Sequence, residues 1–100
     1  MTQFYQGEIY KIIGIKYPVL VVSKDYYNQS GNAVCCPILN TKVDSPICQF
    51  ITTDDIAGYV YCDETRKIDM HARVSKRVGK VSLTDIINIS DIIQGIYDYM

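Results

Sequence analysis

Residues 82–96 read Ser-Leu-Thr-Asp-Ile-Ile-Asn-Ile-Ser-Asp-Ile-Ile-Gln-Gly-Ile and carry the clearest structural signal in the chain. Ser82 is a favourable N-cap, and Asp85 three residues later completes a capping-box pattern. Isoleucines recur at helical spacing, which predicts an amphipathic helix with one apolar stripe. Branched side chains lower the helicity of an isolated segment, so packing on a core must stabilise this helix. The stripe consists of Ile86, Ile89, Ile93 and Ile96.

The chain before this helix is a series of short β-type segments separated by turn residues. Alternating or β-branched apolar residues predict strands in these segments. Residues 25–32 are polar and predict a loop. Pro37 cannot donate a ladder hydrogen bond, so it predicts a bulge or an edge in its strand. The expected strands are residues 7–13, 18–23, 33–39, 46–52, 58–62, 67–71 and 79–82.

Several short strands followed by one helix predict a mostly β (α+β) fold, in which a small barrel-like sheet is crossed by a C-terminal amphipathic helix. A hydrophobic fraction of 48% and a charged fraction of 21% are ordinary for a globular protein. One hundred residues is the size of one ordinary domain. We therefore expect a single domain over residues 1–100.

The sequence predicts a cytoplasmic protein without a membrane partner. Apolar runs such as residues 19–22 are far too short to span a bilayer. The N-terminus lacks the basic region followed by an apolar region that marks a secretory signal. In a reducing compartment, the four cysteines are expected to be free thiols. No cysteine pair has the two-residue spacing of a zinc knuckle, so neither a metal nor another cofactor is expected.

The formal net charge of −1 gives no global electrostatic argument for nucleic-acid binding, but the basic residues are unevenly distributed. Six of the ten Lys and Arg residues fall between residues 66 and 80, with His71 among them. Such a stretch is either a solvated strand face or a phosphate-binding strip. The six residues are Arg66, Lys67, Arg73, Lys76, Arg77 and Lys80.

Five short motifs, in this order and spacing, resemble the MazF/PemK family of toxin–antitoxin toxins over most of the chain. Gly-Glu-Ile-Tyr at 7–10 resembles the opening strand of the family, and Tyr-Pro-Val-Leu-Val-Val-Ser at 17–23 resembles its second strand. Val-Cys-Cys-Pro-Ile at 34–38 is similar to the third strand. Arg-Lys-Ile-Asp at 66–69 resembles an Arg-Thr-Ile-Asp segment, and Gly-Lys-Val-Ser at 79–82 resembles the lead into the C-terminal helix.

The resemblance implies an SH3-like small barrel with a C-terminal helix, a homodimer, and a growth-inhibiting endoribonuclease that cuts single-stranded RNA without metal. It also implies a cognate antitoxin that binds across the RNA groove. In the family, the 2′-hydroxyl attacks the neighbouring phosphodiester and leaves a cyclic phosphate and a 5′-hydroxyl. This chemistry needs a proton acceptor and a cation that stabilises the phosphorane.

Two positions depart from the family pattern. The residue before the strand-opening proline is Tyr17 where the family has arginine, and Lys16 is the nearest cation. Leu39 aligns with a family threonine, and Thr41 lies two residues further on. These departures leave a non-catalytic RNA- or protein-binding module on the same fold as the alternative function. A partner-dependent inhibitor of another enzyme, as in gyrase-poisoning relatives of this fold, is a third hypothesis.

The resemblance implies Lys16, Thr41 and Arg66 as catalytic residues. Lys16 is either the catalytic cation or a surface lysine beside a turn. Thr41 either supplies a displaced catalytic hydroxyl or caps its own loop. Arg66 either contacts RNA or forms an ion pair with Glu64 or Asp69.

Four further residues are the expected RNA-binding set. Tyr17 either stacks on a base or packs at the start of a buried strand. His71 either titrates near neutral pH at the RNA or is solvated on a polar strand. Lys67 and Arg73 belong to the basic stretch and are expected to contact phosphates.

Overall fold

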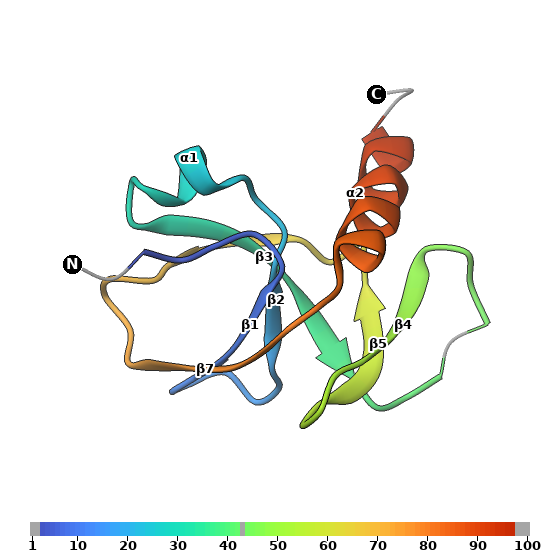
Figure 1. The fold of residues 1–100 in the computed structure, drawn as a ribbon, viewed down its shortest axis with the longest axis horizontal. Coiled ribbons are helices and arrows are strands. Elements are labelled where there is room, and N and C mark those ends of the chain that lie inside the picture. Colours follow the sequence, from blue (N-terminus) through green and yellow to red (C-terminus); the bar gives the residue numbers. More distant parts are fainter. Residues whose placement is uncertain (1–2, 43, 98–100) are drawn as a thin grey trace.

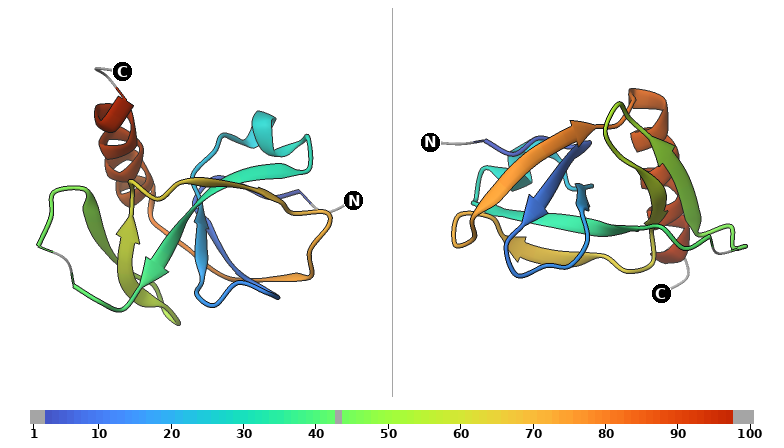
Figure 2. Two further views of the ribbon diagram at one scale, coloured as in Figure 1. Left: turned by 180° about the vertical axis from the view of Figure 1, so that it is seen from behind. Right: turned by 90° about the horizontal axis from the view of Figure 1, so that it is seen from below.

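The computed structural model describes residues 3–42 and 44–97. Its strands form one antiparallel sheet in the order β4-β5-β3-β2-β1-β7, and β6 pairs with β3 beside this path. Figures 1 and 2 show that the sheet curls into a partial barrel and that α2 stands beside β4 and β5. The predicted mostly β fold with a C-terminal helix is therefore confirmed. The elements are β1 (Glu8–Ile12), β2 (Val19–Val21), α1 (Asp25–Asn28), β3 (Asn32–Leu39), β4 (Cys48–Thr52), β5 (Ala57–Tyr61), β6 (Arg66–Asp69), β7 (Ser75–Lys80) and α2 (Leu83–Tyr97).

Strand β3 is the centre of the sheet because three strands pair with it. Its residues 35–37 pair with β2, residues 32–35 with β6, and residues 38–39 with β5. Pro37 lies between the segments that pair with β6 and with β5. The N–H of Ile38 points toward β2 and donates to the carbonyl of Pro18 at 2.9 Å. By alternation, the missing N–H of Pro37 would face the gap between β6 and β5, so an interior strand accommodates this proline without the expected bulge or edge.

Two hydrophobic clusters fill the curled sheet, one on each face of β3. The first lies under α2 and includes Ile9, Leu20 and Cys36. The second lies on the other face and includes Tyr10 and Cys35. The adjacent cysteines thus point to opposite faces, as expected for neighbouring residues of a strand. Cys35, Cys36 and Cys62 are buried free thiols, and Cys48 is a half-buried one.

The C-terminal helix follows its predicted pattern. The Oγ of Ser82 accepts a hydrogen bond from the N–H of Asp85 at 3.1 Å, which confirms the N-cap. Ile86 and Ile89 are buried in the first cluster, and Ile93 and Ile96 pack against it at partial burial. Each fully buried isoleucine contributes about 1.5–3 kcal/mol, so packing holds a helix of weak intrinsic propensity.

Two predicted elements differ from the structure. Residues 25–32 contain one helical turn, α1, because Asn28 is buried and donates to the carbonyls of Phe4 and Ser23. The last strand is Ser75–Lys80 instead of residues 79–82. It has little apolar alternation, and its ladder to β1 holds it in the sheet. Within residues 3–42 and 44–97, no helix is long and apolar enough to cross a membrane.

Candidate nucleic-acid interface

Three of the expected site residues lie at one end of the β2–β3 ladder. The hydrogen bond between Ile38 and Pro18 places the start of β2 beside the end of β3. Lys16 and Tyr17 precede Pro18 in the β1–β2 loop, where Lys16 is exposed and Tyr17 is half-buried. Thr41 is exposed in the segment that follows β3. The fold therefore brings the expected cation and the expected hydroxyl to the same end of two neighbouring strands.

Tyr61 is a further polar side chain at this end of the sheet, and no motif in the sequence marks it. It ends β5, and its hydroxyl donates to the backbone carbonyl of Thr41 at 3.0 Å. Partial burial is the largest cause that raises the pKa of Tyr61. The nearby Cys48, Glu64 and Asp63 raise it further. The phenol therefore keeps its proton and can donate this hydrogen bond to Thr41.

Arg66 and Lys67 lie on β6, opposite Cys35 and Val34 of β3. As neighbours in a strand they project to opposite faces, and both are exposed. The carboxylate of Asp69 accepts hydrogen bonds from backbone N–H groups of the β6–β7 loop. Within the described residues Arg66 forms no ion pair with Asp69 or with any other carboxylate, so its charge is not neutralised there.

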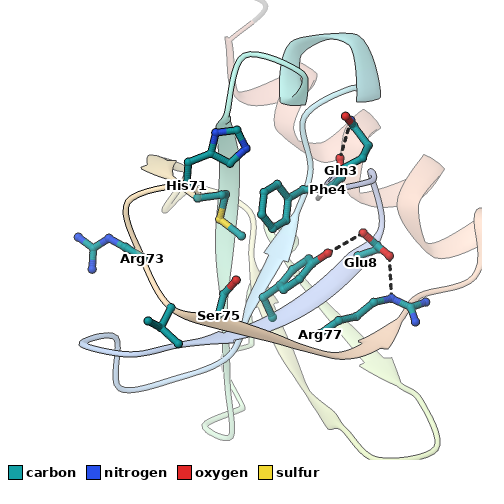
Figure 3. A pocket seen from close by; sticks show the side chains of 10 residues that line it. Gln3, Phe4, Glu8, His71, Arg73, Ser75 and Arg77 are labelled. Carbon is teal, nitrogen blue, oxygen red and sulfur yellow. Dashed lines mark hydrogen bonds and ion pairs between the residues drawn. The ribbon is translucent and has the colours of Figure 1, made fainter. Parts of the chain in front are cut away.

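His71 and Arg73 line a pocket of about 640 Å³ that we call the Arg77 pocket. Figure 3 shows the pocket between the N-terminal segment, the β6–β7 loop and β7. Phe4 and Tyr10 form an aromatic wall, with their ring centroids 5.3 Å apart. His71 continues this wall, because its ring centroid is 6.0 Å from that of Phe4. Arg66, Lys67, Lys16, Tyr17 and Thr41 do not line this pocket.

A buried carboxylate holds Arg77 in the wall of the pocket. Oε2 of Glu8 lies 2.7 Å from Nε of Arg77. Oε1 accepts hydrogen bonds from the Tyr10 hydroxyl at 2.8 Å and from the N–H of Tyr5 at 2.7 Å. Burial, and then the hydrogen bond to Glu8, raise the pKa of Tyr10, so its hydroxyl remains a donor. Arg77 pairs with Glu8 through Nε, so its outer nitrogens remain for a ligand.

Arg73 connects the Arg77 pocket with the β1–β2 loop. A Cβ atom on Gly14 would lie 3.6 Å from Nη1 of Arg73. Gly14 has a φ of +92° and makes the bend from which the loop continues to Lys16. The Arg77 pocket and the loop with Lys16 are thus adjoining parts of one surface. Phe4 and Tyr10 are each only 5% exposed, so the exposed ring of His71 is the part of the wall on which a base can stack. This ring beside cations whose nearest carboxylate is already paired is suited to a phosphodiester with an unstacked base.

Metal ligation was not expected from the sequence. Among the residues that the structure describes, no group of three or more His, Cys, Asp or Glu side chains is arranged to hold a metal ion.

Solved structures of MazF toxins share this fold across nearly their whole length. A MazE–MazF complex from Deinococcus radiodurans has a TM-score of 0.88 at 17% identity, covering 98% of this chain and 99% of that one. An endoribonuclease in complex with its cognate antitoxin, from a mycobacterial species, has a TM-score of 0.83 at 19% identity, covering 97% of each chain. The Mycobacterium tuberculosis toxin MazF-mt6 has a TM-score of 0.73 at 18% identity, covering 91% of this chain and 96% of that one.

At such low identity these structures show the fold alone, and a comparison with curated proteins finds no match. A match between the sequence and a family profile shows the family. The profile of the family described as PemK-like, MazF-like toxin of type II toxin–antitoxin system matches residues 4–97, which includes every strand and both helices. The chain therefore belongs to the family of PemK-like, MazF-like toxins of type II toxin–antitoxin systems.

Proposed function

We propose that this toxin is a cytoplasmic endoribonuclease that cleaves single-stranded RNA without a metal ion. The Arg77 pocket is the observation that supports the proposal, because it combines the exposed ring of His71 with a guanidinium that Glu8 holds in place. Family membership supports it, as do two mycobacterial structural relatives that are described as endoribonucleases.

The proposed chemistry uses the RNA's own 2′-hydroxyl as the nucleophile. Its oxygen bonds to the adjacent phosphorus while the P–O5′ bond breaks, so the products are a 2′,3′-cyclic phosphate and a 5′-hydroxyl. The 2′-hydroxyl proton is lost, and a proton reaches the leaving oxygen, which conserves protons overall. Lys16 and Arg66 supply positive charge for the phosphorane, and the hydroxyl of Thr41 hydrogen-bonds a phosphate oxygen.

Four other residues are assigned to RNA binding in this proposal. Tyr17 offers a ring for base stacking beside Lys16, and His71 extends the aromatic wall of the Arg77 pocket. Arg73 and Lys67 contact phosphates. An exposed lysine acts as a point charge, whereas arginine can bind a phosphate with two parallel hydrogen bonds.

We further propose a cognate antitoxin and a second copy of the chain as protein partners. The antitoxin is supported by two of the structural relatives, which are a MazE–MazF complex and an endoribonuclease bound to its cognate antitoxin. A homodimer would bury part of the apolar surface that the chain leaves exposed, which includes Phe50, Leu83 and Ile87.

The test is incubation of the purified protein with a long single-stranded RNA in excess EDTA, with cuts mapped by primer extension. We expect discrete cuts that end in a cyclic phosphate and disappear in Arg66→Ala and Lys16→Ala. Lys24→Gln is the matched control, because this exposed lysine lies outside the proposed site, and it should cut like the wild type.

Intact RNA at high concentrations of folded protein would overturn the proposed cleavage. A salt-sensitive RNA affinity without products would then identify the non-catalytic binding module, which the tyrosine at position 17 favours.

A further inference from the structure

Two cross-strand pairs form an exposed patch on the ladder between β1 and β7. Lys11 lies directly opposite Lys76 in the register of the two strands. Two residues along, the N–H of Ile13 donates to the carbonyl of Val74 at 3.0 Å. Ile13 is 72% exposed and Val74 is 70% exposed, and both lysines are exposed as well. These four residues border one hollow of about 270 Å³, and we call them the lysine patch.

The two lysines of the patch have no counter-charge in the part of the chain that the structure describes. Side chains directly opposite on paired strands are about 4.5–5.5 Å apart at Cβ, and like charges there are destabilising. Asp55 of the β4–β5 turn borders a neighbouring hollow of about 500 Å³ together with both lysines. Neither lysine forms an ion pair with it or with another described carboxylate. Two adjacent ammonium groups of this kind are suited to an anion from outside the chain.

The patch and the Arg77 pocket adjoin at the same edge strand, and Val74 lines both of them. β7 stands at the end of the strand order and has β1 as its partner among the described strands. Lys76 lies opposite Lys11, and the next residue, Arg77, lies opposite Tyr10 and lines the Arg77 pocket. Arg77 also borders the hollow of about 500 Å³ together with Lys11 and Lys76. An anionic polymer that passed around β7 would therefore meet the arginine and the two lysines in succession.

We propose that the lysine patch is a second RNA-binding site, at which Lys11 and Lys76 bind a backbone phosphate and Ile13 and Val74 contact the adjoining sugar and base. This inference rests on the proposed function, and it extends the RNA from the Arg77 pocket around β7. It assigns the patch a role in affinity and in the length of RNA bound, not in bond cleavage.

A second copy of this chain does not fit the patch. A two-fold interface pairs each surface with itself. With its axis through the patch, it would bring Lys11 and Lys76 of both copies together, and four ammonium groups would face one another around two small apolar pairs. Charge complementarity thus selects an anionic occupant, and in an RNA-cleaving protein the available anionic polymer is the substrate.

The test is RNA affinity measured with an oligonucleotide that cannot be cut. A fluorescein-labelled, fully 2′-O-methylated single strand lacks the attacking hydroxyl, so anisotropy reports binding alone. Titrations at several KCl concentrations give both the Kd and its salt dependence for the wild type, Lys11→Gln, Lys76→Gln and the double variant. Lys24→Gln is the control for loss of one lysine from a different surface.

We expect each patch variant to weaken binding several-fold and to lower the slope of log Kd against log salt by about one, as for a lost phosphate contact. Lys24→Gln should match the wild type. The double variant should also unfold at a temperature equal to or above that of the wild type, because it relieves like-charge repulsion. Weaker binding by a more stable protein would separate a ligand contact from a structural role.

An unchanged Kd and salt slope in the double variant would overturn the proposal. So would loss of binding to phosphatidylserine vesicles in the double variant with RNA affinity intact, which would identify a lipid-binding patch. If RNA affinity depends on the patch but ordinary RNA is not cleaved, only the proposed function is contradicted. If RNA is cleaved but its affinity does not change in the patch variants, only this inference is contradicted.

Discussion

The imidazole of His71 occupies the space where a side chain on Gly31 would begin. A Cβ atom on Gly31 would lie 2.6 Å from Nδ1 of His71, which is shorter than real contacts allow. Gly31 also has a φ of +95°, which L-residues with a side chain rarely adopt. The backbone before β3 therefore fixes where the β6–β7 loop, and with it the aromatic wall of the Arg77 pocket, can lie.

Gly31→Ala should destabilise the protein by about 1–3 kcal/mol through backbone strain and displacement of the histidine ring. Chemical denaturation measures the free energy of unfolding. Gly95→Ala is the matched control, because a Cβ there meets nothing within 4 Å and the residue lies in α2. It should be neutral or stabilise by up to about 1 kcal/mol. Equal effects of the two substitutions would contradict this account of Gly31.

Arg77→Gln should cost about 1–3 kcal/mol of unfolding free energy, because it leaves the buried carboxylate of Glu8 without its cation. The double variant Glu8→Gln with Arg77→Gln should recover part of this loss, since both charges are then gone. Lys76→Gln changes the neighbouring exposed lysine and should stay within about 0.5 kcal/mol. A double-mutant cycle from urea denaturation gives the coupling energy, and a value near zero would show that the ion pair contributes nothing.

Ile89→Ala should lower the free energy of unfolding by about 2–5 kcal/mol. This side chain of α2 is fully buried in the first hydrophobic cluster, and its loss leaves a cavity. Ile87→Ala removes the same atoms from a side chain that is 51% exposed, and should cost much less. The difference between the two unfolding free energies measures how far packing, and not helix propensity, holds α2 on the sheet. Similar costs would mean that the helix is not docked as described.

Stability should fall at alkaline pH because the buried thiols resist ionisation. Burial raises the pKa of Cys35 to about 12 and that of Cys62 to about 12. A thiol in the unfolded chain has a pKa of about 8.5. Above this pH the native state therefore holds more protons than the unfolded state. The stabilising contribution is complete below about pH 8.5 and is lost as the pH rises toward 12.

Urea denaturation at a series of pH values measures this loss, with a slope of up to about 1.4 kcal/mol per pH unit for each thiol. Cys62→Ala removes one titrating group and should give a shallower decline. A stability that is constant between pH 8 and 11 would contradict the burial of these thiols.

The elements that the sequence predicted best are those with strong local patterns. The isoleucine stripe and the serine cap predicted α2, and runs of β-branched residues predicted β2 and β3. Burial on one or both faces of an element produces such a hydrophobic pattern in the sequence. Strand β7 has no such mark. Its residues Lys76 and Arg77 are exposed. It is a strand because it pairs with β1, which lies almost seventy positions earlier in the chain. Pairing partners so distant leave no periodic signal in one sequence.

The candidate site was predictable only in part for the same reason. The sequence drew attention to the basic stretch, and the structure places His71 and Arg73 from it in the Arg77 pocket. It gave no indication that Glu8 would be buried against Arg77, because a lone acidic residue in an opening strand is usually solvated. The roles assigned to Lys16, Thr41 and Arg66 remain predictions, which the cleavage assay tests.

Pairing of the first strand with the last has a consequence for synthesis on the ribosome. Glu8 emerges well before its partner Arg77 and before the whole of β7. Nascent chains can fold only with the residues already available. The Arg77 pocket and the lysine patch both need β7, so neither exists until β7 has been synthesised. A ribosome that stalls before residue 75 would release a fragment that lacks both surfaces, whatever else in it has folded.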